Sequence, residues 1–254
     1  MNLLNTKKLS KSFGGLKAVQ DVDFQISTGE IVSLIGPNGA GKTTFFNLLT
    51  GVYTPDEGEI EFSGERIDHE TPQWIIRRGI ARTFQNIRLF KNMTVLENVM
   101  VGRHCRTRSE LFSALFRTSA FYREEKEIAK SAKERLEFVG LEKHAHELAG
   151  NLAYGEQRLL EIARALATEP RLLLLDEPTA GMNHQESIEL TKLIHKISQE
   201  SITILMIEHR MSLVMKISKT VHVLDHGIKI AEGTPDDIQC NSKVIEAYLG
   251  TEHI

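Results

Sequence analysis

A glycine-rich segment early in the chain has the residue types and spacing of a phosphate-binding loop. Residues 36–43 read GPNGAGKT and match the pattern G-x4-G-K-[ST] between an expected strand and an expected helix. Glycines let successive backbone N–H groups point at phosphate oxygens, and the start of the helix adds partial positive charge. We expect Lys42 to act in catalysis by reaching the β- and γ-phosphates, Thr43 to bind Mg²⁺ and Thr44 to donate to the α-phosphate. The predicted nucleotide-binding residues of this loop are Gly36, Pro37, Asn38, Gly39, Ala40, Gly41, Lys42, Thr43 and Thr44. A turn of the same shape that binds no ligand is the alternative, which the complete pattern in this context disfavours.

Two adjacent carboxylates follow an apolar run in the second half of the chain. Residues 171–178 read RLLLLDEP, so Asp176 and Glu177 lie where a buried strand ends. Asp176 would reach the Mg²⁺ shell through water, and Glu177 would polarise the water that attacks the γ-phosphate. A strand followed by an ordinary polar turn would look the same. The combination with the glycine-rich loop favours the chemical interpretation.

A histidine follows a further apolar run. Residues 204–209 read ILMIEH, which places His209 at the exit of a buried strand. There it would hydrogen-bond the γ-phosphate and sense its loss. A lone histidine at a strand end is more often structural, so this catalytic role depends on the other predicted residues.

The elements that must position these residues alternate between strands and helices. Val22, Phe24 and Ile26 alternate with polar residues, which is typical of a half-buried strand. Further strands are expected at 30–35, 59–62, 172–175, 202–207, 221–224 and 228–231, and helices at 42–50, from residue 71 and at about 184–200. Strands separated by helices indicate βαβ units and a parallel sheet. Gly51 is placed to end the first helix, and Thr234 to begin a last helical region.

The character of the sequence changes after Gln85. Thr94 and Glu97 have the spacing of a helix capping box, and the chain is helical in pattern and charged from there to about Leu148. Residues 124–138 mix Glu with Lys and Arg, as solvated helix faces do. We expect a helical lobe inserted into an α/β core.

The composition and net charge are those of an ordinary globular protein. The 254 residues are 41% hydrophobic and 26% charged, and the formal net charge of −3 gives no global basic field for nucleic acid. The apolar runs are far shorter than the roughly 18 to 20 residues of a membrane span. The first residues lack a signal-peptide pattern, and isolated Cys105 and Cys240 fit a reducing compartment. We therefore expect a cytoplasmic protein that reaches a membrane only through a partner.

Residues 151–158, NLAYGEQR, resemble the signature segment of ABC ATPases. The resemblance implies a head-to-tail dimer in which the signature of each subunit closes over the ATP of the other. Gly155 would present its backbone N–H to the γ-phosphate at a helix start. The signature residues expected to bind nucleotide are Leu152, Ala153, Tyr154, Gly155 and Glu156. A glycine-containing helix cap is the alternative.

Other landmarks of the same family occur in the expected order. Phe13 resembles the aromatic residue that stacks on adenine, although a core or hairpin aromatic would look alike. Gln85 resembles the catalytic glutamine that touches Mg²⁺ and water and links the core to the helical lobe, whereas a surface glutamine is the alternative. Asn183 occupies the loop that contacts the opposite subunit, but with Glu186 it would also make a good helix cap.

Two positions depart from the family pattern. Ala153 stands where the signature commonly has Ser, so a hydroxyl contact to the γ-phosphate is missing. A hydrogen bond to a charged group contributes roughly 1.5–3 kcal/mol, so stabilisation of the transition state is expected to be weaker unless backbone donors suffice. Asn183 stands where Asp is common, which changes the charge of that contact.

The resemblance covers essentially the whole chain and implies its fold, domains and partners. The implied fold is an α/β P-loop NTPase core with a mainly parallel sheet, an N-terminal antiparallel β-subdomain and an inserted helical subdomain. Residues 1–254 would form one ABC ATPase domain, with 1–85 and 156–254 as the core and about 86–155 as the helical subdomain. Implied partners are ATP with Mg²⁺, a second ATPase subunit that is either identical or different, transmembrane permease subunits and, indirectly, a substrate-binding protein. The chain would then lie on the cytoplasmic side of the membrane.

Within the family, three segments are similar to ATPase subunits of bacterial branched-chain amino-acid importers. They are residues 82–103, 152–166 and 244–250. Urea or short-amide importers and the lipopolysaccharide-export ATPase share parts of them, so these substrates stay as alternatives. Non-transport ABC ATPases carry two cassettes or a long coiled coil between the loop and the signature, and this sequence has neither. A GTPase would leave the signature unexplained and would need an Asn-Lys-x-Asp motif, which the sequence lacks.

Several weaker signals have a structural explanation. His144 and His146 would diverge on a helix, so a metal site is not expected there. Trp74 is interpreted as a packing residue. Three apolar residues of the lobe allow either a core role or an exposed groove for a membrane partner; they are Phe112, Leu115 and Phe116.

Overall fold

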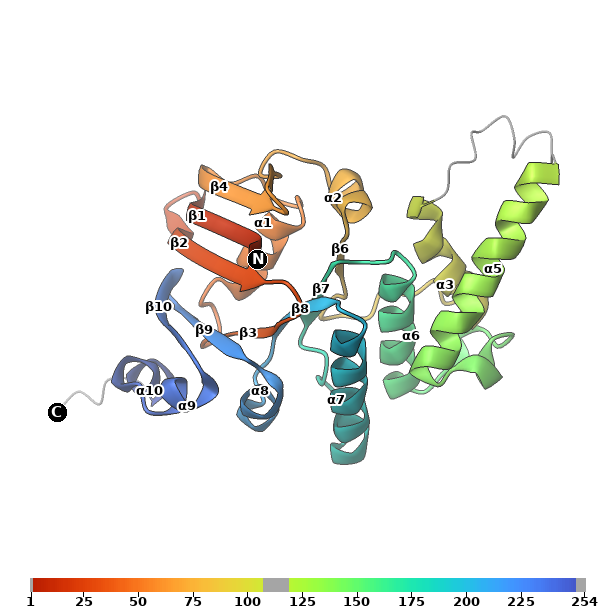
Figure 1. Ribbon diagram of the computed structural model, residues 1–254. Helices are drawn as coiled ribbons and strands as arrows, with labels where there is room; N and C mark the ends of the chain where they lie inside the picture. Colours follow the sequence, from red (N-terminus) through yellow and green to blue (C-terminus); the bar gives the residue numbers. More distant parts are fainter. Residues whose placement is uncertain (1, 107–118, 250–254) are drawn as a thin grey trace.

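The computed structural model describes residues 2–106 and 119–249, and it contains two sheets (Figure 1). The larger one has six strands in the order β10-β9-β3-β8-β7-β6, and all its pairs are parallel except β9 with β10. Its strands are β3 (Ile31–Ile35), β6 (Ile80–Arg82), β7 (Leu172–Asp176), β8 (Thr203–Ile207), β9 (Thr220–Asp225) and β10 (Ile228–Gly233). The expected parallel sheet and terminal hairpin are confirmed.

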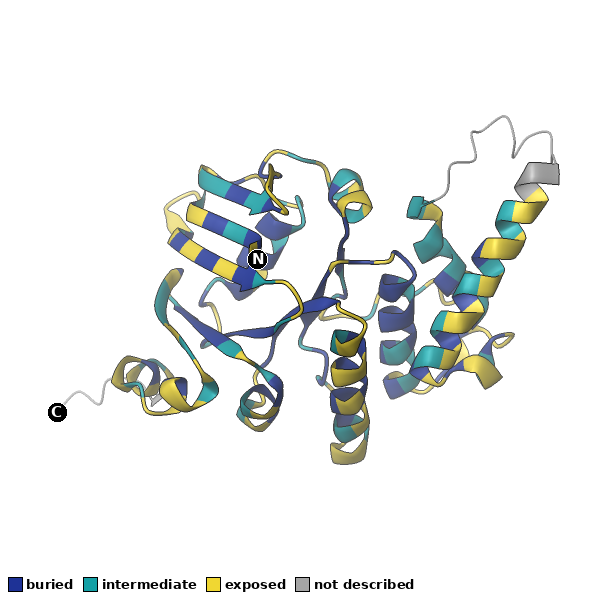
Figure 2. Cartoon of the chain, viewed as in Figure 1, coloured by how far each residue is buried: buried dark blue, intermediate teal, exposed yellow. Residues whose placement is uncertain are grey.

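The central strands β3, β7 and β8 are buried on both faces. Every residue of these three strands is buried, which explains their continuous apolar sequences. In β3, Val32 and Leu34 belong to one apolar cluster, whereas Ile31 and Ile35 belong to the other. The sheet therefore separates two cores, and Figure 2 shows it as the dark interior of the molecule.

An antiparallel sheet of four strands, in the order β2-β1-β4-β5, covers one face of this core. Its strands are β1 (Asn2–Phe13), β2 (Leu16–Ser27), β4 (Glu57–Phe62) and β5 (Glu65–Arg66). The phenyl rings of Phe24 in β2 and Phe45 in the first helix approach to 5.0 Å between centroids. This sheet is the expected N-terminal antiparallel β-subdomain.

The helices that flank the core are α1 (Lys42–Leu49), α2 (Pro72–Arg78), α7 (His184–Gln199), α8 (Met211–Ile217), α9 (Pro235–Gln239) and α10 (Ser242–Leu249). All except α8, which was not predicted from the sequence, begin close to an expected helix or lie in the expected last helical region. After α1, Gly51 adopts a φ of 68° and its N–H donates to the Leu48 carbonyl at 3.2 Å, as expected for a glycine that ends a helix. Thr71 accepts a hydrogen bond from the Trp74 N–H at the start of α2.

Three helices form a lobe beside the core: α3 (Val95–Arg103), α5 (Ser119–Val139) and α6 (Tyr154–Leu166). The predicted capping box begins α3, where the Thr94 N–H donates to the Glu97 carboxylate at 2.7 Å and the Glu97 N–H donates to the Thr94 hydroxyl at 3.2 Å. Each of the three helices contacts the other two. Short 3₁₀ turns cover His104–Arg106, Glu142–His144 and Ala149–Asn151. Phe112, Leu115 and Phe116 lie outside the described residues.

None of the helices in residues 2–106 and 119–249 combines the length and apolar character that crossing a bilayer requires. The architecture is an α/β core with a mainly parallel sheet, an antiparallel β-subdomain and a helical lobe, as the sequence predicted.

Candidate functional site

A cavity of about 660 Å³ opens where the carboxyl ends of the parallel strands meet the antiparallel sheet. It gathers most of the residues singled out from the sequence. Among its lining residues are Phe13, Asn38, Gly39, Ala40, Gly41, Lys42, Thr43, Thr44, Gln85, Glu177 and His209. Gly36 and Pro37 lie at the beginning of the same loop. Segments that are far apart in the sequence thus converge on one cleft.

The loop depends on its glycines because neighbouring backbones approach it closely. Gly36 has a φ of 150°, and a Cβ there would lie 2.0 Å from the carbonyl oxygen of Leu224. Gly41 has a φ of 98°, and a Cβ there would lie 2.2 Å from the carbonyl oxygen of Ala18. Both positions therefore exclude a side chain. They fix the turn that leads directly into α1.

The ammonium group of Lys42 lies inside the curl of this loop. Its Nζ donates to the carbonyl oxygens of Gly36 and Pro37, each at 2.8 Å. Burial lowers the pKa of Lys42 below its usual value, and the negative charges of Glu177 and Asp176 act against that shift. The loop backbone thus holds a positive charge at a position where an anion such as a phosphate can bind it. Thr43, the next residue, is exposed towards the cleft.

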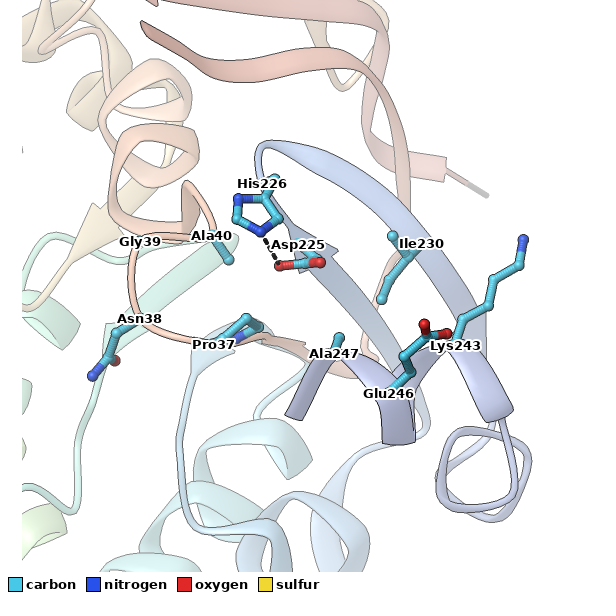
Figure 3. Close-up of a pocket in the computed structure, with 10 residues that line it drawn as sticks. All are labelled: Pro37, Asn38, Gly39, Ala40, Asp225, His226, Ile230, Lys243, Glu246 and Ala247. Carbon is cyan, nitrogen blue, oxygen red and sulfur yellow. Dashed lines mark ion pairs between the residues drawn. The ribbon is translucent and has the colours of Figure 1, made fainter. Parts of the chain in front are cut away.

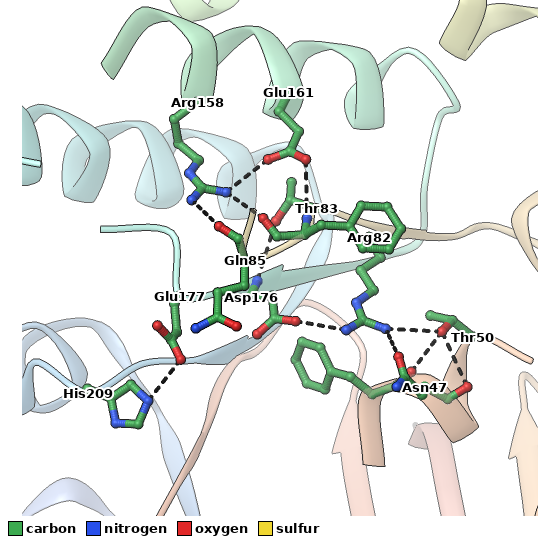
Figure 4. Close-up of polar contacts among 12 residues, drawn as sticks. Asn47, Thr50, Arg82, Thr83, Gln85, Arg158, Glu161, Asp176, Glu177 and His209 are labelled. Atoms are coloured by element: carbon green, nitrogen blue, oxygen red, sulfur yellow. Dashed lines mark hydrogen bonds and ion pairs between the residues drawn. The ribbon is translucent and has the colours of Figure 1, made fainter. Parts of the chain in front are cut away.

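Asp176 is buried, does not line the cavity, and is paired with Arg82, a partner that was not predicted from the sequence (Figure 4). The Arg82 Nη2 donates to the Asp176 Oδ2 at 2.8 Å, and both side chains are at most 6% exposed. The Arg82 Nη1 also donates to the Asn47 Oδ1 at 2.6 Å. Arg82 ends β6, which lies next to β7, so the pairing of these two strands brings the charges together. A cation following an apolar strand is the signal that was available in the sequence.

Glu177 and His209 are in direct contact at the rim. The His209 Nε2 lies 3.0 Å from the Glu177 Oε1. Because an ionised carboxylate only accepts hydrogen bonds, Nε2 carries the hydrogen in this pair when Glu177 is charged. Glu177 has a φ of 46°, an unusual backbone conformation for a residue other than glycine, and its N–H donates to the Ile207 carbonyl at 2.9 Å. Such strained positions cluster at functional sites.

Gln85 is exposed and also lines the cavity. Its side chain lies near Asp176 and Glu177 in Figure 4, while its carbonyl oxygen accepts a hydrogen bond from Arg158 at 2.8 Å. No cluster of three or more His, Cys, Asp or Glu side chains in the described part of the chain has the arrangement of a metal site. Magnesium is instead commonly held by one or two carboxylates together with substrate phosphates. The oxygens of Thr43, Asp176 and Gln85 fit such a metal in type.

Phe13 forms the far end of the cleft, at the tip of β1. Its ring packs edge-on against Tyr53 with 5.1 Å between centroids, and it is 42% exposed. A large aromatic residue that is half exposed at a cleft offers a flat face to a planar ligand. Its place beside the cavity disfavours the interpretation as a core aromatic.

The signature residues lie apart from the cavity. None of residues 152–156 lines it. Ala153 is the N-cap of α6, and its N–H donates to the Glu156 Oε2 at 2.9 Å. Alanine has no hydroxyl, so only half of a capping box forms. Tyr154 and Ala153 are exposed, whereas Leu152 and Gly155 are buried.

Asn183 performs the capping role proposed for it. Its Oδ1 accepts the Glu186 N–H at 2.9 Å, and its own N–H donates to the Glu186 Oε2 at 2.8 Å. Residues 180–183 lie against the signature segment of the same chain, because a Cβ on Gly181 would meet the Tyr154 ring at 2.8 Å.

The weaker signals have structural roles. Arg78 stacks over the Trp74 ring at 4.3 Å, and Trp74 packs against one of the two cores. His144 pairs with the carboxylates of Glu147 and Glu156 at 2.9 and 3.4 Å.

A second cavity of about 570 Å³ lies behind the phosphate loop, where α10 faces the β9–β10 turn (Figure 3). It was not anticipated from the sequence.

Comparisons with known sequences agree with this geometry. Residues 19–180 match the ABC transporter family, and residues 229–254 match a family described as branched-chain amino acid ATP-binding cassette transporter. The chain is 48% identical over 249 residues to the high-affinity branched-chain amino acid transport ATP-binding protein BraF of Pseudomonas aeruginosa. It is 49% identical over 249 residues to LivG of Escherichia coli, which carries the same description. Each match covers 98% of both chains.

Solved structures extend the comparison to three dimensions. A nucleotide-free ATP-binding cassette from an ABC transporter superposes with a TM-score of 0.87 at 34% identity, over 98% of this chain and 100% of the other. A dimeric ATP-binding cassette in a post-hydrolysis state, bound to ADP and Pi, superposes with a TM-score of 0.78 at 25% identity, over 92% of this chain and 99% of the other.

Proposed function

Because this chain belongs to the ATP-binding subunits of ABC transporters, we propose that it hydrolyses ATP to drive the import of branched-chain amino acids. The observation that supports this most is the convergence of Lys42, Gln85, Glu177 and His209 on one cavity beside a phosphate-binding loop. The relatives named above are described as branched-chain amino acid transport proteins, and each match covers 98% of both chains. The match of the C-terminal residues to a family with the same substrate supports that choice over amides or lipopolysaccharide.

Different residues of the cavity bind the phosphates, the adenine ring and Mg²⁺. The loop amides and Lys42 bind the β- and γ-phosphates and neutralise their charge. Phe13 stacks on the adenine ring. Mg²⁺ would be held by Thr43, Gln85 and, through water, Asp176, and it would supply charge neutralisation between the phosphates.

Water is activated at the pair of Glu177 and His209. The Glu177 carboxylate orients the water and takes its proton as the water attacks the γ-phosphate. In the described structure this carboxylate accepts a hydrogen bond from His209. His209 thereby holds Glu177 at the rim, and its Nε2–H is available to a γ-phosphate oxygen once that contact opens.

The signature segment acts on a second subunit. Leu152, Ala153, Tyr154, Gly155 and Glu156 lie outside the chain's own cavity, so they bind the ATP of a partner arranged head to tail. The N-terminus of α6 presents its free N–H groups to that γ-phosphate. The dimeric ATP-binding cassette of similar fold supports this assembly. Permease subunits place the dimer on the cytoplasmic side of the membrane and link it to a substrate-binding protein.

Uptake into vesicles tests this function. We expect the chain, reconstituted with branched-chain amino acid permease subunits and a substrate-binding protein, to import leucine in an ATP-dependent manner. Lys42→Ala should reduce import by about 100-fold or more, since it removes a charge aimed at the transition state. Import of urea or short amides but not of leucine would overturn the substrate. Recovery of the chain with ribosomes or DNA instead of a permease would overturn transport itself.

A further inference from the structure

A completely buried ion pair lies in α6, outside the ATP cavity. The Arg158 Nη1 donates to the Glu161 Oε2 at 2.9 Å, and the two side chains are 0% and 1% exposed. Burial raises the pKa of Glu161, and the positive charge of Arg158 opposes this shift. Buried charges cost free energy unless hydrogen bonds satisfy them, so such a pair calls for an explanation.

The pair forms hydrogen bonds to the backbone around Gln85 (Figure 4). The Arg158 guanidinium donates to the carbonyl oxygens of Phe84 at 2.6 Å and Gln85 at 2.8 Å. The Glu161 Oε1 accepts the N–H groups of Phe84 at 3.3 Å and Arg88 at 3.4 Å. The carbonyl oxygens of the segment around Gln85 are therefore bound by the positive side chain of this helical turn, and its N–H groups by the negative one. Hydrogen bonds to charged groups are stronger than neutral ones.

The same helix carries the signature segment at its N-terminus. The Arg158 Nη2 lies 3.5 Å from the Tyr154 hydroxyl. Gly155 lies against Glu186, where a Cβ would meet the Oε1 at 2.8 Å. One turn of α6 thus separates the groups that hold Gln85 from the groups that would face a partner subunit's ATP.

We propose that Arg158 and Glu161 are positioning residues that couple the placement of Gln85 in one ATP site to the placement of the signature segment that completes the other. This rests on the head-to-tail dimer of the proposed function. An α-helix is stiff over a single turn, and the buried charges keep their partners because leaving them unpaired is costly. Any shift of the segment around Gln85 therefore moves the N-terminus of α6 with it. In a dimer this links the two ATP sites through each chain.

Two variants break the link in different ways. Arg158→Met with Glu161→Leu removes both charges together, which buried ion pairs often tolerate. Arg158→Lys keeps the charge beside Glu161 but replaces the planar guanidinium, whose two terminal nitrogens reach Phe84 and Gln85 separately, with a single ammonium that does not reproduce this geometry. The matched control is Arg135→Met with Glu200→Leu, because Arg135 also pairs with a glutamate between lobe and core, at 2.9 Å, but contacts neither Gln85 nor the signature.

Mixed dimers with two affinity tags test the two ends of the link separately. Glu177→Gln in one chain leaves only the other chain's ATP to be hydrolysed. With the charge-removing variant in the hydrolysing chain, the single-turnover rate reports on Gln85. With it in the Glu177→Gln chain, the rate reports on the signature. ATP affinity, read by a fluorescent ATP analogue, serves as the second measurement.

We expect the single-turnover rate to fall about tenfold or more in both arrangements, because misplacement by about 1 Å is enough for such losses. ATP affinity should change less than about twofold, since Lys42 is untouched, and Arg158→Lys should show the same pattern. A wild-type rate when the variant lies in the Glu177→Gln chain would overturn the coupling, as would an equal loss in the control. A reference mixed dimer that hydrolyses no ATP would overturn the proposed function itself.

Discussion

At the scale of the residue, Arg82 and Asp176 show how the site combines charge with burial. The carboxylate proposed to serve Mg²⁺ is already neutralised by a guanidinium at 2.8 Å, and neither side chain is more than 6% exposed. Arg82 is fixed in turn by Asn47 of α1, the helix that follows the phosphate loop. The pair thus ties the floor of the site to the helix that carries Lys42, and removing either partner would strand a buried charge.

His222 gives a prediction on pH at the same scale. It is fully buried on β9, its ring stacks on Phe24 at 3.8 Å between centroids, and burial lowers its pKa to about 4. The carboxylate of Glu232, 3.4 Å from Nδ1, opposes this change without forming a hydrogen bond. In the unfolded chain, His222 takes up a proton at its ordinary pKa of about 6.5. In the folded chain it stays neutral until the pH approaches 4. Stability is therefore complete above about pH 6.5 and falls as the pH drops to 4.

Urea unfolding at pH 7 and pH 4.5 measures this effect. Wild type should lose up to about 3 kcal/mol more than His222→Phe between these conditions, because each tenfold difference in proton affinity between the folded and unfolded chains corresponds to about 1.4 kcal/mol. Since phenylalanine keeps the ring on Phe24, its own pH dependence is the reference. Equal losses in the two proteins would contradict the account.

The residues of the site were largely predictable because local patterns specify them. The phosphate loop needs its glycines in order, and Asp176 and Glu177 follow a run of four leucines that only a buried strand explains. Arg82 and Arg158 were not predicted to have roles, because Arg82 meets Asp176 across 94 residues of the sequence and Arg158 meets the Gln85 carbonyl across 73. Long-range pairs of this kind depend on strand order and helix packing.

At the scale of the element, the N-terminus of α6 is weaker than its counterparts. Thr94 begins α3 and Asn183 begins α7 with complete capping boxes, whereas Ala153 begins α6 with half of one. A helix start without a side-chain acceptor leaves an N–H group unsatisfied unless water or a ligand accepts it. In the proposed dimer, that ligand is the γ-phosphate of the partner's ATP.

Two cap variants of opposite direction test this comparison. Ala153→Ser should stabilise the chain by about 1 kcal/mol, and Asn183→Ala should destabilise it by a similar amount, as N-cap exchanges do. Urea midpoints give both values in one series. A destabilising Ala153→Ser would mean that α6 begins in a geometry that a serine cap cannot serve.

The boundaries of strands and helices were predictable where the spacing of apolar residues follows a single period, and not elsewhere. The buried strands and the capped helices follow simple patterns. Strand β1 escaped prediction because its pairing with β2 shifts register several times and Lys8 has a φ of 47°, so the alternation of polar and apolar residues is broken. Strand β6 has 3 residues, too few to show any period.

At the scale of the whole molecule, the chain has two parts, and the segment that joins them reaches the cavity at Gln85. The core holds the phosphate loop, and the lobe of α3, α5 and α6 carries the signature segment (Figure 1). Gln85 lies where the chain passes from one part to the other, and it lines the cavity. The signature residues lie outside that cavity, so in the proposed dimer a single chain holds only half of each complete site.

We therefore propose that ATP is hydrolysed between two copies of this chain arranged head to tail. The most direct measurement is the mass of Glu177→Gln by light scattering, with and without Mg²⁺ and ATP. Glu177→Gln keeps the loop and the shape of the side chain but cannot accept a proton from water. The matched control is the same chain with Lys42→Ala, which should stay at the mass of one copy.

The account predicts that ATP doubles the mass of Glu177→Gln, and that the bound nucleotide remains ATP while hydrolysis falls about 100-fold or more. A Glu177→Gln chain that keeps the mass of one copy in saturating ATP, or that turns ATP over at the wild-type rate, would contradict it.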